Sequence, residues 1–317
     1  MPQFDVFNGD ADGLCALHQL RLAVPAASAL VSGPKRDIAL LERVDAAAGD
    51  RVTVFDVSLD RNRAALERLL ARGVAVQWFD HHHPGAIPSH PLLEAHIDTA
   101  PETCTSAIVD RHLGGRFRAW AVVAAYGDGL ARTAGALADA VGLGEGDRAT
   151  LRALGEDLNY NAYGDTEADL CVAPAALYRE LAPHESPLRF AAEASVVAKL
   201  RERRLADLAA ARAVAPYRDG ILVLPDAAWA HRVSGTLANE LAEREPGRAH
   251  AVLVASADGS YRVSIRAPHA TPAGCAALAR EFATGGGREA AAGIDRLPAA
   301  DLARFVERFR AAFPAQP

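Results

Sequence analysis

The sequence lacks several features that would place it in a common class of protein. Its four cysteines, Cys15, Cys104, Cys171 and Cys275, include no C-x-x-C pair, which argues against a zinc ribbon, a redox pair or a disulfide framework. No G-x-x-x-x-G-K-[ST] segment is present, which removes the usual NTPase interpretation. The chain also lacks an uninterrupted apolar run of about 18 residues, and its first residues are acidic where a signal peptide is apolar. We therefore expect a cytoplasmic protein with no membrane partner.

Lysine is scarce as well. Only Lys35 and Lys199 are lysines among 34 basic residues, and 40 acidic residues give a net charge of −6. Because alanine is also abundant, the arginines indicate a GC-rich coding bias and do not by themselves indicate phosphate binding. A net acidic chain is not a non-specific coat for nucleic acid. Its 317 residues, 50% of them apolar, predict a globular protein of about two domains.

Short apolar runs alternate with helical periodicity at the start of the chain. This alternation predicts an α/β fold with a mainly parallel sheet covered by helices. The expected strands in this part are 3–7, 27–32, 51–58 and 74–80. Residues 105–181 are mostly helical by periodicity and complete a first domain, 1–186.

The rest of the chain predicts a connector and a second, smaller α/β domain. Residues 187–214 contain no internal glycine or proline, which predicts one long connecting helix. Strand-like segments follow at 221–225, 250–256 and 261–267. We assign the smaller domain to residues 215–317.

An acidic turn, NGDADG at residues 8–13, separates the first strand from the first helix. Ligands of open α/β sheets bind at the carboxyl ends of strands, and two carboxylates placed there, such as Asp10 and Asp12, suit Mg²⁺ or Mn²⁺. A plain turn is the alternative, because aspartate and glycine are favoured in turns.

Two further predicted strands end in aspartate. Asp56 follows RVTVF, and Asp80 follows VAVQWF and precedes three histidines, 81–83. Acids at the end of an apolar sheet need a cation to neutralise them. Imidazole nitrogens favour Mn²⁺, Zn²⁺ or Fe²⁺ over Ca²⁺. A solvated histidine loop is the alternative interpretation of residues 81–83.

These motifs resemble those of the DHH phosphoesterase superfamily. The family includes RecJ-type single-strand exonucleases, nanoRNases, pAp phosphatases and cyclic-dinucleotide phosphodiesterases. Its four motifs match, in order, Asp10-Ala11-Asp12, Asp56, Asp80-His81-His82 and Asp128. The NGDADG turn is close to the RecJ-type version of the first motif.

The resemblance extends to the C-terminal part of the chain. Residues 285–293, GGGREAAAG, resemble the glycine-rich motif of the DHH-associated domain, and Arg266 in SIR resembles a strand arginine that meets substrate phosphate. The substrate-binding residues implied by the resemblance are Arg266, Gly285, Gly286, Gly287 and Arg288. The glycines would present backbone N–H groups to a terminal phosphate. A helix-to-helix turn is the alternative for the glycine run.

The resemblance also implies a set of roles in two-metal hydrolysis of a phosphoester, with two Mn²⁺ or Mg²⁺ ions per chain. The implied metal ligands are Asp10 for the first ion, Asp12, His81 and Asp128 for the second, and Asp56 as the bridge. The implied catalytic residues are Asp80, which orients the loop, and His82, which hydrogen-bonds the phosphate or donates a proton to the leaving group.

Three positions depart from the family pattern. Pyrophosphatase-type and nanoRNase-type members carry a histidine ligand where this chain has Val6, and RecJ-type members carry an aspartate where it has Asn8. We therefore expect the first ion to be held more weakly. Arg288 replaces the usual histidine but keeps a positive charge that binds phosphate bidentately.

Two functions from different classes remain open. The first is a Mn²⁺- or Mg²⁺-dependent phosphoesterase acting on short single-stranded oligonucleotides or small nucleotides such as pAp or a cyclic dinucleotide. Long polymers are less favoured because the chain is acidic. The second is a non-catalytic nucleotide-binding or regulatory protein on a degenerate DHH fold, and its support is Val6 and Asn8. A homodimer is left open as the assembly.

Overall fold

A computed structural model of the chain describes residues 2–215 and 219–314. It confirms the α/β fold class, with one five-stranded sheet in each of two compact units, Met1–Glu202 and Arg203–Pro317. The boundary falls inside helix α9 (Ser195–Arg212), within the predicted connector 187–214. Every helix formed by the described residues is too short or too polar to cross a membrane.

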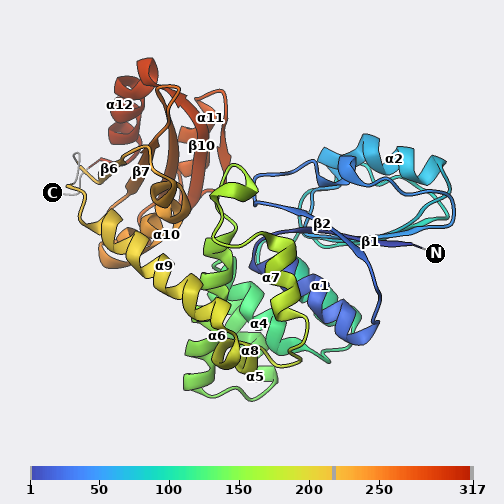
Figure 1. Ribbon diagram of the computed structural model, residues 1–317. Coiled ribbons are helices and arrows are strands. Elements are labelled where there is room, and N and C mark those ends of the chain that lie inside the picture. The colour runs from blue at the N-terminus through green and yellow to red at the C-terminus, as the bar shows by residue number, and fades with distance from the viewer. Residues whose placement is uncertain (1, 216–218, 315–317) are drawn as a thin grey trace. The chain divides into compact units, whose positions relative to one another are not determined.

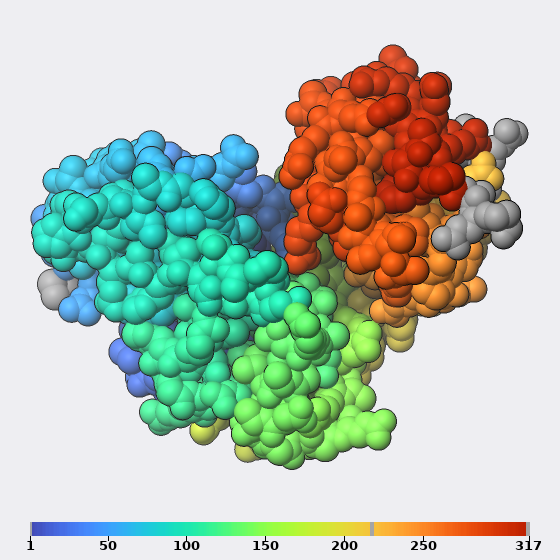
Figure 2. Space-filling view, turned by 180° about the vertical axis from the view of Figure 1, so that it is seen from behind, coloured from blue at the N-terminus to red at the C-terminus, as the bar shows by residue number. Residues whose placement is uncertain are grey.

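The first unit is a parallel sheet with helices on both faces (Figure 1). Its strands are β1 (Gln3–Asn8), β2 (Ala29–Gly33), β3 (Arg51–Phe55), β4 (Ala75–Asp80) and β5 (Leu93–Ile97). Its helices are α1 (Ala11–Ala23), η1 (Leu40–Arg43), α2 (Arg63–Ala71), α3 (Thr105–His112), α4 (Arg118–Gly127), α5 (Ala131–Ala140), α6 (Glu145–Asn161), α7 (Pro174–Leu181) and α8 (Pro187–Glu193). The teal and green segments that follow β5 form much of the surface of this unit in Figure 2.

Side chains alternate between the two faces of this sheet, as the period of a β-strand requires. Phe7 and Phe55 pack in a core with α1, α3, α4 and α6, whereas their neighbours Val6 and Val54 pack in a second core with η1 and α2. Because both faces of the sheet are buried, the sequences of these strands are nearly continuous apolar runs.

Strand order is the feature that positions the site. The order is β2-β1-β3-β4-β5, and all four pairings are parallel. The chain therefore leaves every strand at the same edge of the sheet. The register pairs Phe7 with Phe55 and Phe55 with Phe79, so the residues that follow these strands become neighbours.

The second unit contains a mixed sheet in the order β6-β7-β8-β10-β9, in which only β6 and β7 pair in parallel. Its strands are β6 (Ile221–Leu224), β7 (His250–Ala255), β8 (Ser260–Arg266), β9 (Gly285–Gly287) and β10 (Ala291–Pro298). Its helices are α10 (Ala228–Arg244), α11 (Cys275–Arg280) and α12 (Leu302–Ala312). α12 buries Phe305 and Phe309 against Ile294 and other apolar residues of one core.

Three local predictions were wrong or incomplete. Residues 187–214 do not form one helix, because the backbone at Ala194 is extended (φ −83°, ψ 115°) and separates α8 from α9. Strands β5, β9 and β10 were not predicted. The helix-to-helix alternative for Gly285–Gly287 is wrong, since these residues form edge strand β9, and Gly287 adopts φ 138°, which favours glycine.

Candidate metal centre

The acidic turn between β1 and α1 is built by two interlocking helix caps. The Asp10 carboxylate caps α1, with Oδ1 accepting from the backbone N–H groups of Asp12 (3.1 Å) and Gly13 (3.0 Å). Asp12 accepts from the first two N–H groups of α3, those of Thr105 and Ser106, at 2.7 Å each. Backbone donors at helix N-termini favour the ionised carboxylate. Both aspartates are therefore held in one orientation.

Asp56 has an unusual backbone. It follows β3 in a left-handed conformation, with φ 57°, and is buried. A residue other than glycine held there is strained, and such strain clusters at functional sites. Its N–H donates to the Phe79 carbonyl at 3.0 Å, and its Oδ1 accepts from the Thr105 hydroxyl at 3.0 Å. The strained backbone places this carboxylate between the two neighbouring acidic segments.

The segment Asp80-His81-His82 is organised by the Asp80 carboxylate. Its Oδ1 accepts from the backbone N–H of His81 (2.9 Å) and from Nδ1–H of His82 (2.7 Å). The Nδ1–H of His81 donates to the Thr103 carbonyl at 3.0 Å, which turns Nε2 toward Asp56 Oδ1 at 3.3 Å. In metal-binding histidines, a hydrogen bond from the ring nitrogen that does not face the metal fixes the tautomer and the ring orientation.

Two overlapping groups of ligand atoms result. The ligand atoms of Asp12, His81 and Asp128 lie within 4.8 Å of one another, and so do those of Asp56, His81 and His82. These residues come from α1, the end of β3, the end of β4 and the C-cap of α4. Carboxylates with one or two imidazoles suit Mn²⁺, Fe²⁺ or Zn²⁺, and the carboxylates alone suit Mg²⁺.

The electrostatics of the group call for a cation. Burial, followed by the charges of Asp56 and Asp128, raises the pKa of Asp12 well above its ordinary value. Burial and then Asp10 raise the pKa of Asp56 to about 6. Burial opposes protonation of His81, but its hydrogen bond to Asp56 and the nearby carboxylates raise its pKa to about 10. A divalent ion would relieve this repulsion between carboxylates and replace the His81 proton, so the residues fit such an ion.

One residue of the centre was missed in the sequence. Lys35 lies just after β2, and its Nζ is 2.5 Å from Asp10 Oδ2 and 3.4 Å from Asp128 Oδ1. Burial opposes the ionised form of Asp10, but the Lys35 ammonium lowers the pKa of that carboxyl. The scarcity of lysine was the available signal, since Lys35 is one of only two.

Four of the predicted substrate residues lie on the sheet of the second unit, and the fifth, Arg288, lies in the turn that follows β9. Arg266 on β8 pairs with Ala291 on β10, which pairs in turn with β9. The Arg266 guanidinium donates to Asn239 Oδ1 (2.5 Å) and to the Ile265 and Gly235 carbonyls. The N–H of Gly285 donates to the Phe282 carbonyl at 2.9 Å and so is already used. Arg288 is exposed in the turn after β9.

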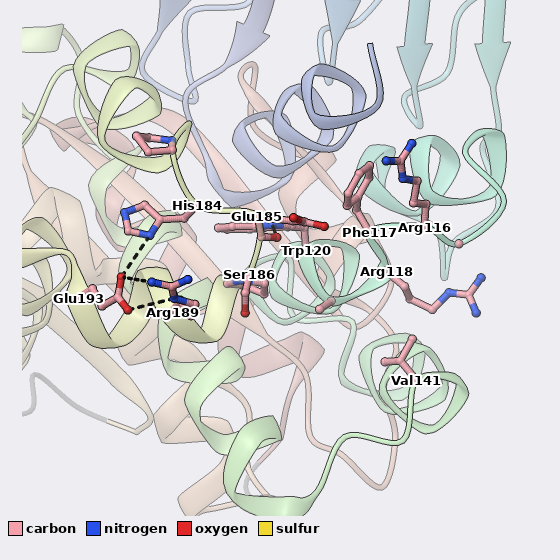
Figure 3. A pocket seen from close by; sticks show the side chains of 14 residues that line it. Arg116, Phe117, Arg118, Trp120, Val141, His184, Glu185, Ser186, Arg189 and Glu193 are labelled. Atoms are coloured by element: carbon pink, nitrogen blue, oxygen red, sulfur yellow. Dashed lines mark hydrogen bonds and ion pairs between the residues drawn. The ribbon is translucent and has the colours of Figure 1, made fainter. Parts of the chain in front are cut away.

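A separate cavity of about 650 Å³ lies between the start of α4 and the start of α8 (Figure 3). Its lining includes Arg116, Trp120, His184, Arg189 and Glu193, and none of the predicted metal ligands. Within it, Arg189 pairs with Glu193 at 3.0 Å. The acidic centre and this cavity are therefore distinct parts of the first unit.

Comparison with known proteins gives similarity in structure alone. No family model matches the chain, and no curated protein matches its sequence. The structure of exonuclease RecJ bound to manganese is 20% identical, with 99% of this chain and 91% of that chain covered and a TM-score of 0.60. The DHH domain of a member of a ribosomal-protein family is 15% identical, with 98% and 86% covered and a TM-score of 0.61. The pGpG-specific phosphodiesterase PggH from Vibrio cholerae is 14% identical, with 97% of each chain covered and a TM-score of 0.53.

Proposed function

Because the chain has the fold of the DHH phosphoesterases, we propose that it is a divalent-metal-dependent phosphoesterase. The observation that carries this proposal is the convergence of Asp12, Asp56, His81 and Asp128 at one edge of the parallel sheet. The strained backbone of Asp56 supports a functional rather than a structural role for this group. The structural neighbours named as a manganese-bound exonuclease and a pGpG phosphodiesterase support the same class of reaction.

These ligands would hold a divalent ion, which would act as a Lewis acid toward a phosphoryl oxygen and would lower the pKa of bound water. The protein supplies ligands that are oriented before substrate arrives. Asp12 is held by the N-terminus of α3, Asp56 by Thr105 and His81 by the Thr103 carbonyl. Preorganised charged groups of this kind lower the barrier without rearranging during the reaction.

His82 is the proposed general acid. Burial opposes its protonation, but the hydrogen bond to Asp80 raises its pKa, so the imidazolium form is favoured. Asp80 holds Nδ1–H, which leaves Nε2–H to donate. Water forms the new P–O bond and releases one proton to solvent, the bond to the leaving oxygen breaks, and the His82 Nε2 proton passes to that oxygen.

We propose short oligonucleotides or small nucleotides as substrates. The net charge of −6 disfavours long polyanions, whose binding depends on many cationic contacts. Within the second unit, we propose that edge strand β9 and the exposed Arg288 contact a substrate phosphate. We propose that Arg266 contributes less than Arg288 to phosphate binding, because its guanidinium already donates hydrogen bonds to Asn239 and Gly235 of α10.

The test is hydrolysis by the purified protein with Mn²⁺, Mg²⁺ or EDTA. The substrates are pAp, a linear dinucleotide, a cyclic dinucleotide, a five-nucleotide RNA, a longer single-stranded DNA and pyrophosphate. Asp128→Asn removes one ligand charge with little change in shape, and Asp139→Asn is the matched control because Asp139 is exposed and pairs with Arg148. We expect metal-dependent turnover of a short nucleotide that Asp128→Asn loses and Asp139→Asn keeps.

The same panel separates the second candidate function. Val6 is buried at a position where family members place a histidine ligand, and this observation favours a nucleotide-binding protein without catalysis. No turnover of any substrate, with nucleotide binding retained, would refute the enzyme and support that alternative.

A further inference from the structure

Lys35 occupies a distinctive place in the order of the sheet. It follows β2, the neighbour of β1, so at the carboxyl edge its segment lies beside the Asp10 turn. Its backbone N–H donates to the Ala162 carbonyl at 2.9 Å, and its Nζ lies 5.9 Å from the centre of the Tyr163 ring. The side chain is therefore directed into the acidic centre by contacts at both its backbone and its ammonium end.

The Lys35 ammonium lies where a second cation would have to bind. It contacts carboxylate oxygens of both Asp10 and Asp128, at 2.5 and 3.4 Å. A small divalent ion in the same place would need carboxylate oxygens at about 2.0–2.2 Å. A divalent ion could occupy this position only by displacing the ammonium, because the two cations repel and their volumes overlap.

Both carboxylate oxygens of Asp10 already accept hydrogen bonds. Its Oδ1 accepts two backbone N–H groups of α1, and its Oδ2 accepts Lys35. Among the described residues, the groups of three ligand atoms that could hold an ion include Asp12 and Asp56 but not Asp10. In the part of the chain that the structure describes, two buried oxygens of the acidic segments have no hydrogen-bond partner, Oδ1 of Asn8 and Oδ2 of Asp80, and the one on the Asp10 turn is the amide oxygen of Asn8. A single neutral oxygen does not offset the ammonium.

The presence of lysine rather than arginine at position 35 supports a role for its side chain as a compact positive charge. Nearly all basic positions in this chain are arginine, and Lys35 is one of two exceptions among 34. An ammonium is a compact point charge, whereas a guanidinium is a planar fork. A compact ammonium contacts Asp10 and Asp128 at once without the fixed planar orientation that a guanidinium requires.

We propose that this centre binds one divalent ion, held by Asp12, Asp56, His81 and Asp128, and that the Lys35 ammonium takes the place of a second ion beside Asp10. The proposal deepens the proposed function and rests on it. It replaces the two ions implied by the family resemblance with one ion and one fixed charge. The Lys35 side chain as a whole is 32% accessible.

The test counts bound Mn²⁺ by equilibrium dialysis and elemental analysis, without substrate. The variants are Lys35→Ala, Lys35→Met and the matched control Lys199→Ala, which removes the other lysine, exposed on α9. The electron paramagnetic resonance spectrum of each sample reports whether two Mn²⁺ ions are magnetically coupled. Far-ultraviolet circular dichroism and the thermal midpoint establish that each variant is folded.

We expect one Mn²⁺ per chain in the wild type and in Lys199→Ala. We expect a twofold higher count, with a coupled spectrum, in Lys35→Ala or Lys35→Met, because removing the ammonium leaves Asp10 and Asp128 free to bind an ion. Two ions in the wild type would overturn the proposal and leave the phosphoesterase intact. One ion in the folded Lys35 variants would overturn it as well, and no bound ion in the wild type would overturn both proposals.

Discussion

Replacement of Asp56 by glycine should stabilise the metal-free protein while abolishing metal binding and hydrolysis. The carboxylate is 3% exposed, its pKa is raised to about 6, first by burial and then by Asp10, and its backbone is left-handed. An acid with a raised folded pKa contributes stability below its ordinary value of 3.8, and this contribution is lost as pH rises through the folded pKa of about 6. At pH 8 the ionised Asp56 therefore destabilises the metal-free fold.

The size of the effect follows from four contributions. A shift of about 2 pKa units corresponds to about 3 kcal/mol in favour of removing the carboxylate. Relief of the left-handed backbone adds about 1 kcal/mol. Loss of the Thr105 hydrogen bond costs about 1 kcal/mol, and the greater freedom of glycine in the unfolded chain costs about 1 kcal/mol. The expected net gain for Asp56→Gly is about 2 kcal/mol at pH 8.

Urea unfolding in EDTA at pH 4 and pH 8 measures this gain, with Asp56→Ala as the matched variant. Alanine removes the carboxylate and keeps the backbone strain of about 1 kcal/mol, but it avoids the unfolded-chain freedom of glycine, which costs about 1 kcal/mol. These two differences offset each other, so we expect Asp56→Ala to gain about as much as Asp56→Gly at both pH values. The advantage of both variants over the wild type should shrink toward pH 4, where the carboxylate is largely protonated. Saturating Mn²⁺ should stabilise the wild type alone. A glycine variant less stable than the wild type at pH 8 in EDTA would refute the reasoning.

Three further outcomes are expected. His82→Asn should lower kcat by about 10²- to 10⁴-fold without reducing bound Mn²⁺, and an unchanged kcat would exclude the general acid. Gly13→Ala should lower the free energy of unfolding by more than about 2 kcal/mol, because its Cβ would lie 2.1 Å from the Asn8 carbonyl oxygen; a urea titration that matches the wild type would contradict this. Burial lowers the pKa of His18 to about 4, against its hydrogen bond to the His184 carbonyl. The stability that neutral His18 provides is fully present above pH 6.5, and about 3 kcal/mol of it is lost as the pH falls toward 4. In thermal or urea unfolding, the stability of His18→Phe should not show this loss between pH 6.5 and pH 4.

The acidic part of the centre could be predicted from the chain alone. Asp10, Asp56 and Asp80 each follow an apolar strand, and the carboxyl ends of parallel strands share one edge of a sheet. That rule needs only the local pattern and the strand direction. The DHH-type motifs therefore indicated both the fold and the residues that surround the proposed ion.

The glycine-rich segment 285–287 shows where local patterns were insufficient. Its composition is compatible with a turn, a phosphate loop or a strand, and pairing with β10 selects the strand. The break at Ala194 is similar, since alanine has the highest intrinsic helix propensity and nothing in residues 187–214 signals an end to the helix. The strand at 285–287 depends on pairing with another part of the chain.

The sequence by itself determined the parallel sheet, its two apolar faces and the aspartates at its carboxyl edge, because each of these follows from periodicity over a few residues. Only the tertiary structure decided which other groups complete the centre. Lys35 reaches Asp10 because β2 pairs with β1, and the N-terminus of α3 reaches Asp12 across 93 residues of chain. These contacts depend on strand order and helix packing, which are non-local and leave no periodic trace in the sequence.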